Sequence, residues 1–153
     1  MNFSSVGCRA IATMLLLGTS SSYATGIISA SCSEPEGVRY DAVGGKTGRN
    51  DDKFTGVRPQ FVLSASSPKK LTVIWPDSQT LGANAKQQAH EAHIIDMSDS
   101  MISAVVLYEE RVNLYTLFPK KGIAFMSTHK QIPVQGGVAS GSLFKMECKF
   151  EAS

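Results

Sequence analysis

Three short runs rich in Val, Ile, Leu, Tyr and Phe follow one another between Met101 and Lys130, and no other part of the chain constrains its fold as strongly. The runs are Met101–Tyr108, Val112–Phe118 and Gly122–Thr128, with only short polar breaks between them. β-Branched and aromatic residues favour strands, and one strand across the first two runs would exceed the usual ~3–10 residues. We therefore predict an antiparallel β-meander, to which the rest of the chain adds further strands.

The second break of this meander, Pro119-Lys120-Lys121-Gly122, predicts a tight turn. Proline fixes the φ angle that such a turn needs, and Gly122 can take the left-handed conformation that closes it. Both faces of the flanking strands carry apolar residues, which indicates a sheet covered on both sides or a barrel with a partly apolar outer wall. The predicted fold is all-β, an antiparallel β-sandwich or an up-and-down barrel of about eight or nine strands.

The first 24 residues have the pattern of a secretory signal peptide, which we expect to form a helix that is later removed. Arg9 precedes a short apolar core, Ala10–Gly18, and Ser22-Tyr23-Ala24 offers a small-x-small cleavage site. The apolar core is shorter than the ~20 residues of a transmembrane helix. We predict cleavage after Ala24, a single mature domain over residues 25–153, and a periplasmic or secreted location.

The cysteines indicate a disulfide bond. Cys8 leaves with the signal peptide, so Cys32 and Cys148 remain as a pair in an exported chain. Two buried free thiols are the alternative. A bond between residues so far apart requires the first and last strands to be neighbours, which favours a closed sheet. The chain-entropy account gives such a loop roughly 4–5 kcal/mol of stability.

The charge balance excludes some partners. Fifteen basic residues stand against 13 acidic ones, and the signal peptide removes one of the basic residues. Nearly neutral chains of this kind are poor ligands for nucleic acid or for anionic membranes. We expect a monomer, no nucleic-acid partner, no transmembrane segment after cleavage, and no cofactor.

Other segments complete the expected sheet. Trp75 is expected to anchor the core. Gly44–Gly56 and Gln131–Ser142, both rich in Gly, are expected to be long flexible loops. The segment Ala83–Ala92 could be a helical turn, although we prefer a strand beginning near Glu91. The further predicted strands are Ile27–Ser33, Val38–Val43, Val57–Ser64, Lys70–Trp75, Glu91–Met97 and Leu143–Phe150.

Few residues suggest a catalytic or metal-binding site. His90, His93 and Asp96 could gather around a metal ion if their segment were helical, but on a strand the two histidines point to opposite faces. We therefore predict no metal site and no catalytic residues. A hydrolase that uses His129 with an aspartate is the least favoured hypothesis.

Two resemblances accompany this interpretation. The segment Tyr115–Gly122, Phe125, Ser127-x-His129 and the Gly-rich stretch before Phe144–Phe150 resemble small exported bacterial β proteins that have no assigned activity. That likeness supplies no catalytic residues. Ser140-Gly141 also resembles the Ser-Gly inhibitory loop of periplasmic lysozyme inhibitors, which are small disulfide-linked antiparallel β-barrels, with Phe144 where a tyrosine would be expected.

The favoured function is a non-enzymatic exported domain that binds a protein or another component of the envelope or the extracellular space. A small barrel that binds an apolar ligand, or a lysozyme-inhibitor-like protein, is the alternative. We expect an acidic partner to meet Lys120 and Lys121, because a short, stiff turn presents two charges at little ordering cost. His129 should lie level with Val112 at the opposite end of this hairpin, and should be dispensable.

Overall fold

A computed structural model describes residues 28–76, 87–132 and 137–152 of the chain. The predicted signal helix and its cleavage site lie outside these residues. No helix within the described ranges has the length and apolar character needed to cross a bilayer. The described strands are β1 (Ile28–Cys32), β2 (Glu36–Val43), β3 (Lys46–Lys53), β4 (Gln60–Leu63), β5 (Lys70–Pro76), β6 (Gln87–Met97), β7 (Ile102–Tyr108), β8 (Arg111–Phe118), β9 (Ile123–Ile132) and β10 (Val138–Ala152).

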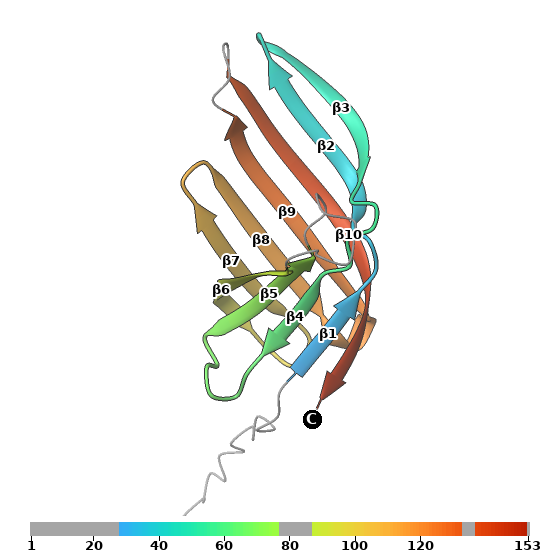
Figure 1. The fold of residues 1–153 in the computed structure, drawn as a ribbon, viewed down its shortest axis with the longest axis vertical. Helices are drawn as coiled ribbons and strands as arrows, with labels where there is room; N and C mark the ends of the chain where they lie inside the picture. The colour runs from blue at the N-terminus through green and yellow to red at the C-terminus, as the bar shows by residue number, and fades with distance from the viewer. Residues whose placement is uncertain (1–27, 77–86, 133–136, 153) are drawn as a thin grey trace, which may run out of the picture.

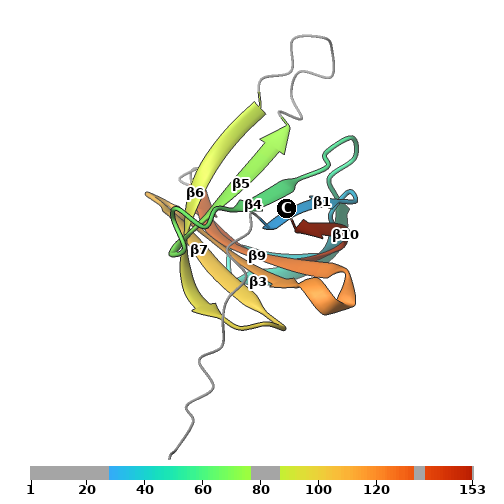
Figure 2. The same cartoon turned by 90° about the horizontal axis from the view of Figure 1, so that it is seen from below.

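Eight of these strands close into an antiparallel barrel (Figures 1 and 2). The order around the barrel is β1, β4, β5, β6, β7, β8, β9 and β10, and β10 returns to pair with β1. The all-β prediction is confirmed, and of its two alternatives the barrel is the one that forms. Closure gives each strand of the ring a neighbour on both sides, and β3, outside the ring, is the end strand of the sheet.

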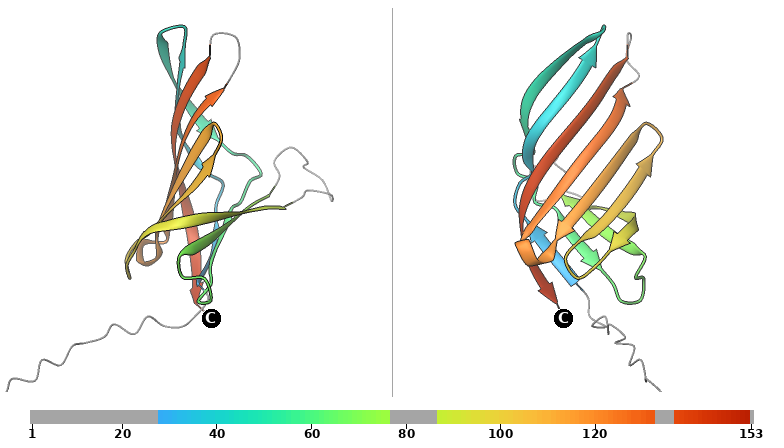
Figure 3. Two further views of the ribbon diagram at one scale, coloured as in Figure 1. Left: turned by 90° about the vertical axis from the view of Figure 1, so that its left-hand side faces the viewer. Right: turned by 180° about the vertical axis from the view of Figure 1, so that it is seen from behind.

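The β2–β3 hairpin lies outside the ring. It pairs with the first half of β10, so β2, β3, β9 and β10 rise together above the level of β4 and β5 as a tall wall (Figure 3). The prediction of a loop over Gly44–Gly56 is therefore wrong for most of that segment. Its polar composition signals exposure, yet β3 forms because its backbone pairs with β2 while its side chains stay mostly in water.

The long strand β10 also corrects the second predicted loop. β9 continues to Ile132 and β10 already begins at Val138, so Gln131–Ser142 is largely strand; residues 133–136 lie outside the described part. The first half of β10 pairs with β2 and its last part with β1, while β9 lies along its other side. One strand thus joins the wall to the barrel.

The meander and its turns follow the prediction closely. β7 and β8 meet at a two-residue turn, Glu109-Glu110, since Tyr108 pairs directly with Arg111. Between β8 and β9 the chain makes a 3-10 turn at Pro119–Lys121, and Gly122 closes it with a left-handed φ of 65°. The strand before the meander is longer than predicted: β6 begins at Gln87, which rules out a helix over its described residues.

The core fills the lower part of the barrel, where β1 begins and β10 ends (Figure 1). Tyr115, Phe61 and Phe144 are among its largest side chains, and each is no more than 1% exposed. The predicted disulfide is confirmed, because Cys32 of β1 is bonded to Cys148 of β10 at the seam of the barrel. Because the large core side chains fill this part of the barrel, its interior is packed and does not form a channel.

Candidate functional site

Side chains that face the inside of the wall change from apolar to polar toward its upper end. The strand registers place them in three rows across β8, β9, β10, β2 and β3. Inward-facing charges on a sheet are costly unless they serve binding or pairing. From the core upward the rows are Tyr115, Met126, Phe144, Gly37 and Asp52; then Asn113, Thr128, Ser142, Arg39 and Asn50; then Arg111, Lys130, Ser140, Asp41 and Gly48.

A pocket of about 590 Å³ lies against these rows at the open upper end of the barrel. We call it the mouth pocket, and its lining includes Phe54, Trp75, His90, Asn113, Thr128 and Ser142. The barrel is open here because the described pairs between β6 and β7 lie only between His93–Met97 and Ile102–Val105. Above that point the described strand pairs end, and the rings of His90 and Tyr108 lie 5.6 Å apart between the two strands.

A buried hydrogen-bonding group lies under this pocket. The Tyr115 hydroxyl accepts hydrogen bonds from Trp75 Nε1 and from Asn113 Nδ2, each at 3.2 Å. Burial raises the pKa of Tyr115, and the bonds from Asn113 and Trp75 offset part of that rise, so the phenol stays neutral.

Asn113 itself is only 6% exposed, and its Oδ1 has no hydrogen-bond partner among the described residues. An amide can turn over to let the tyrosine hydroxyl donate to Oδ1, but Nδ2 would then be the atom left without a partner. Either way Asn113 keeps one hydrogen-bonding position unused. Leaving such an atom unpaired costs about 1–3 kcal/mol, so it requires an explanation.

Aromatic rings form one side of the pocket. The Phe54 ring lies between Trp75, at a centroid distance of 5.8 Å, and Phe144, at 4.9 Å. Trp75 is half-buried and packs against the edge of the core, so it is less deeply placed than the sequence suggested. Its position exposes part of an aromatic surface to whatever enters the mouth.

The inward-facing charges on β2 and β3 form ion pairs with one another. Arg39 forms ion pairs with Asp41 at 2.9 Å and with Asp52 at 2.7 Å. The Ser140 hydroxyl and the Arg39 guanidinium hold the pKa of Asp41 below its usual value. This side of the pocket therefore carries one more carboxylate than cation, and the charge of Lys130 on β9 also helps to lower the pKa of Asp41.

The charges on β8 and β9 are not balanced in the same way. Arg111 and Lys130 are direct cross-strand partners. The Arg111 guanidinium lies 4.1 Å from the centre of the Tyr108 ring. In the described part of the chain neither cation has a carboxylate within ion-pair distance.

The residues predicted to bind a partner lie elsewhere. Lys120 and Lys121 are exposed at the opposite end of the barrel, where the carbonyl of Gly122 accepts a hydrogen bond from Cys148 N at 2.8 Å. His129 pairs with Val112, so the predicted separation between the lysine turn and His129 is confirmed. Whether either feature binds a partner stays a prediction.

The two histidines considered as metal ligands lie on strand β6. His90 lines the mouth pocket, while His93 is exposed, as expected for opposite faces of a strand. Within the described ranges, no three His, Cys, Asp or Glu side chains gather as a metal site would require. Ser140 and Gly141 lie within β10, paired on both sides, so they form no loop of the kind that the lysozyme-inhibitor likeness implied.

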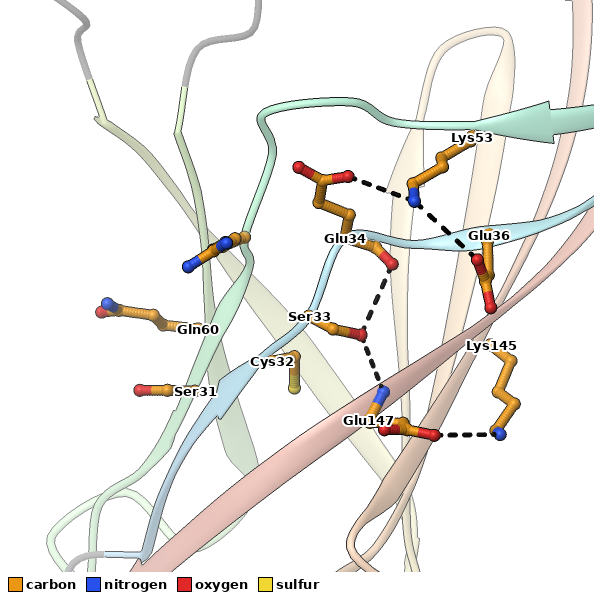
Figure 4. A pocket seen from close by; sticks show the side chains of 10 residues that line it. Ser31, Cys32, Ser33, Glu34, Glu36, Lys53, Gln60, Lys145 and Glu147 are labelled. Carbon is orange, nitrogen blue, oxygen red and sulfur yellow. Dashed lines mark hydrogen bonds and ion pairs between the residues drawn. The ribbon is translucent and has the colours of Figure 1, made fainter.

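A second hollow, of about 730 Å³, lies on the outer flank near the disulfide (Figure 4). Two of its lysines pair with glutamates: Lys53 lies 3.4 Å from Glu34, and Lys145 lies 3.6 Å from Glu147, while Arg58 lines the same hollow. These ion pairs are partly or largely exposed and of balanced charge, and exposed pairs contribute little energy. The flank hollow therefore offers a ligand fewer unused interactions than the mouth pocket does.

No protein-family model, no curated protein and no solved structure matches the chain. The functional interpretation therefore depends on the geometry alone. Sequence reasoning missed Arg111 and Asn113, although a signal for them exists. Both share the alternation of Tyr115 and Leu117 along β8, so the inward face of one strand changes from apolar to polar at its mouth end.

Proposed function

We propose that the protein is an exported, non-enzymatic β-domain that binds a component of the envelope or the extracellular space, and that this component binds in the mouth pocket. One observation carries the proposal, namely the buried Asn113 under the pocket with an amide atom that no described residue satisfies. Buried polar atoms in native proteins are nearly always paired, so an exception calls for a specific cause, and a bound molecule is one such cause. That atom exposes less than 1 Å² of surface, so a ligand donor or acceptor would complete the group after a small shift of the side chains that cover it.

The packed barrel favours a ligand at the mouth over an apolar ligand inside. Tyr115, Phe61 and Phe144 fill the lower interior, so a molecule there would have to displace large side chains. The mouth pocket already exists and combines aromatic surface with convergent polar groups. This is the usual character of sites for small molecules, whose volumes run from about 300 to 1,000 Å³.

Native mass spectrometry of protein purified gently from the periplasm of expressing cells tests the proposal. We expect a non-covalent adduct of small mass on the wild-type protein and its loss from the Asn113→Leu variant. An Arg58→Gln variant is the matched control, because Arg58 is exposed and lies outside the mouth pocket.

The same preparation, incubated with a fractionated small-molecule extract of the envelope, should show a raised melting temperature for the wild type but not for Asn113→Leu. If no fraction produces an adduct or a thermal shift, or if Asn113→Leu responds as the wild type does, the mouth pocket is not the binding site.

The lysine turn needs a separate test, because it lies at the other end of the molecule. A pull-down with Lys120→Ala/Lys121→Ala should lose an acidic protein partner that His129→Ala retains. The reverse pattern, with folding unchanged in both variants, would assign partner binding to the surface around His129.

A further inference from the structure

We infer that the mouth pocket takes an acidic sugar, with its carboxylate between Arg111 and Lys130, its hydroxyl or amide groups on the row of Asn113, and one ring face on Trp75. The inference rests on the proposed function and adds to it the chemical class of the ligand. Three independent features of the pocket carry it, and each is matched by a different part of such a molecule.

The first feature is a pair of cations. Arg111 and Lys130 occupy directly opposed positions of β8 and β9, and both point to the inner face. Like charges directly opposite one another destabilise a pair of strands. Neither side chain forms an ion pair among the described residues, whereas Arg39 nearby forms two. Lys130 is near enough to Asp41 to help lower the pKa of that carboxyl, while Arg111 lies against the Tyr108 ring. A bound anion would remove the repulsion and gain two charge-assisted hydrogen bonds.

The second feature is a row of neutral hydrogen-bonding groups one step deeper in the pocket. Asn113, Thr128 and Ser142 are consecutive cross-strand neighbours on β8, β9 and β10. All three line the pocket, and Asn113 keeps an amide atom unused. A polyhydroxylated molecule supplies several donors and acceptors at such spacing, while a simple hydrocarbon anion supplies none.

The third feature is the aromatic surface on the other side of the pocket. Trp75 is held by its hydrogen bond to Tyr115 and by its contact with the Phe54 ring, so its indole is fixed before a ligand arrives. One face of a pyranose ring consists largely of C–H groups, and packing it on a fixed indole costs little ordering entropy. A neutral sugar would leave the cations unmatched, and an aromatic acid would leave the Asn113 row unmatched.

The fluorescence of Trp75 offers a direct assay, because it is the only tryptophan in the chain. N-acetylmuramic acid and N-acetylglucosamine serve as matched probes that differ by a lactyl ether carrying the carboxylate. We expect the acidic sugar to change the emission of Trp75 and to bind at least about tenfold more tightly than the neutral one, since hydrogen bonds to charged groups are the strong ones.

Variants separate the charge of the site from the charge of the whole protein. Arg111→Gln/Lys130→Gln should bring the two affinities within about twofold of each other. Arg58→Gln/Lys69→Gln removes the same two residue types at exposed positions outside the pocket and should leave the preference intact. If both double variants lower the affinity equally, the preference reflects net charge, and the assigned anion position is wrong.

The remaining outcomes distinguish this inference from the proposed function. Equal affinity for the two sugars, or tighter binding of benzoate than of N-acetylmuramic acid, would overturn the acidic sugar while leaving a mouth ligand in place. The same holds if none of the three probes binds but the purified protein still carries an adduct that Asn113→Leu lacks. Absence of both probe binding and adduct would overturn the two proposals together.

Discussion

Replacing Asn113 with leucine should stabilise the folded protein while removing its ligand. The unused amide atom of Asn113 costs about 1–3 kcal/mol in the unliganded state. Losing the bond to the Tyr115 hydroxyl costs about 1 kcal/mol, and burying the two leucine methyl groups returns about 1.5 kcal/mol. The free energy of unfolding should therefore rise by about 1.5–3.5 kcal/mol.

Tyr115→Phe provides the contrast within the same group of side chains. It leaves both Trp75 Nε1 and Asn113 Nδ2 without their acceptor, so the free energy of unfolding should fall by about 1–3 kcal/mol. Urea unfolding followed by circular dichroism gives both values, and the fluorescence of Trp75 provides a second probe of the same transition.

The essential result is that the two substitutions change the free energy of unfolding in opposite directions. If Asn113→Leu destabilises the protein as much as Tyr115→Phe does, then Asn113 serves the fold, and the argument for a ligand at the mouth fails. With a mouth ligand present at a hundredfold excess over its Kd, the wild type should gain about 2.7 kcal/mol and Asn113→Leu should gain nothing.

Three further predictions follow from the fold. Gly37→Ala should lower the free energy of unfolding by about 2–3 kcal/mol, because a Cβ at this position would overlap the backbone of β10. Gly48→Ala is the control: a Cβ at Gly48 would meet no atom within 4 Å, so this variant should leave the free energy of unfolding unchanged in the same urea titration. Replacing both bridging cysteines with alanine should cost about 3–5 kcal/mol, since the bond closes a separation of 116 residues, and a loss below about 1 kcal/mol would mean that the unfolded chain is compact without it. The Ser140 hydroxyl and Arg39 lower the pKa of Asp41 in the folded protein. Asp41 therefore stabilises the fold above its unfolded pKa of about 4, and this contribution is lost as the pH falls through its folded pKa. Asp41→Asn should weaken the pH dependence of stability below about pH 4 and leave it unchanged near neutrality.

Features with local causes could be predicted from the sequence. Alternation along Val112–Phe118, the Pro119–Gly122 turn and the pair Cys32–Cys148 each follow from the residues themselves, and each is present. The cysteines also favoured a closed sheet, because their bond requires the terminal strands to be neighbours, but they left the sandwich and the barrel as alternatives.

Features with tertiary causes could not be predicted. The segment Lys46–Lys53 has a loop-like composition and becomes a strand only because β2 is held by β10, which is distant in sequence. The mouth pocket depends on that same wall, since Arg39 gains its place in the lining only when β2 joins β10. Residue types alone do not show which face of such a hairpin turns inward.

The position of β10 also determines when the protein can fold. Hairpins from β4 to β9 join neighbours in sequence and can form early, but β10 must pair with β2 and β1, which precede it by about a hundred residues. Until Cys148 has been made, the barrel has no seam, the wall has no support, and the two thiols cannot meet. A chain with this topology stays open during synthesis, and it completes its native contacts and its mouth only after the last strand arrives.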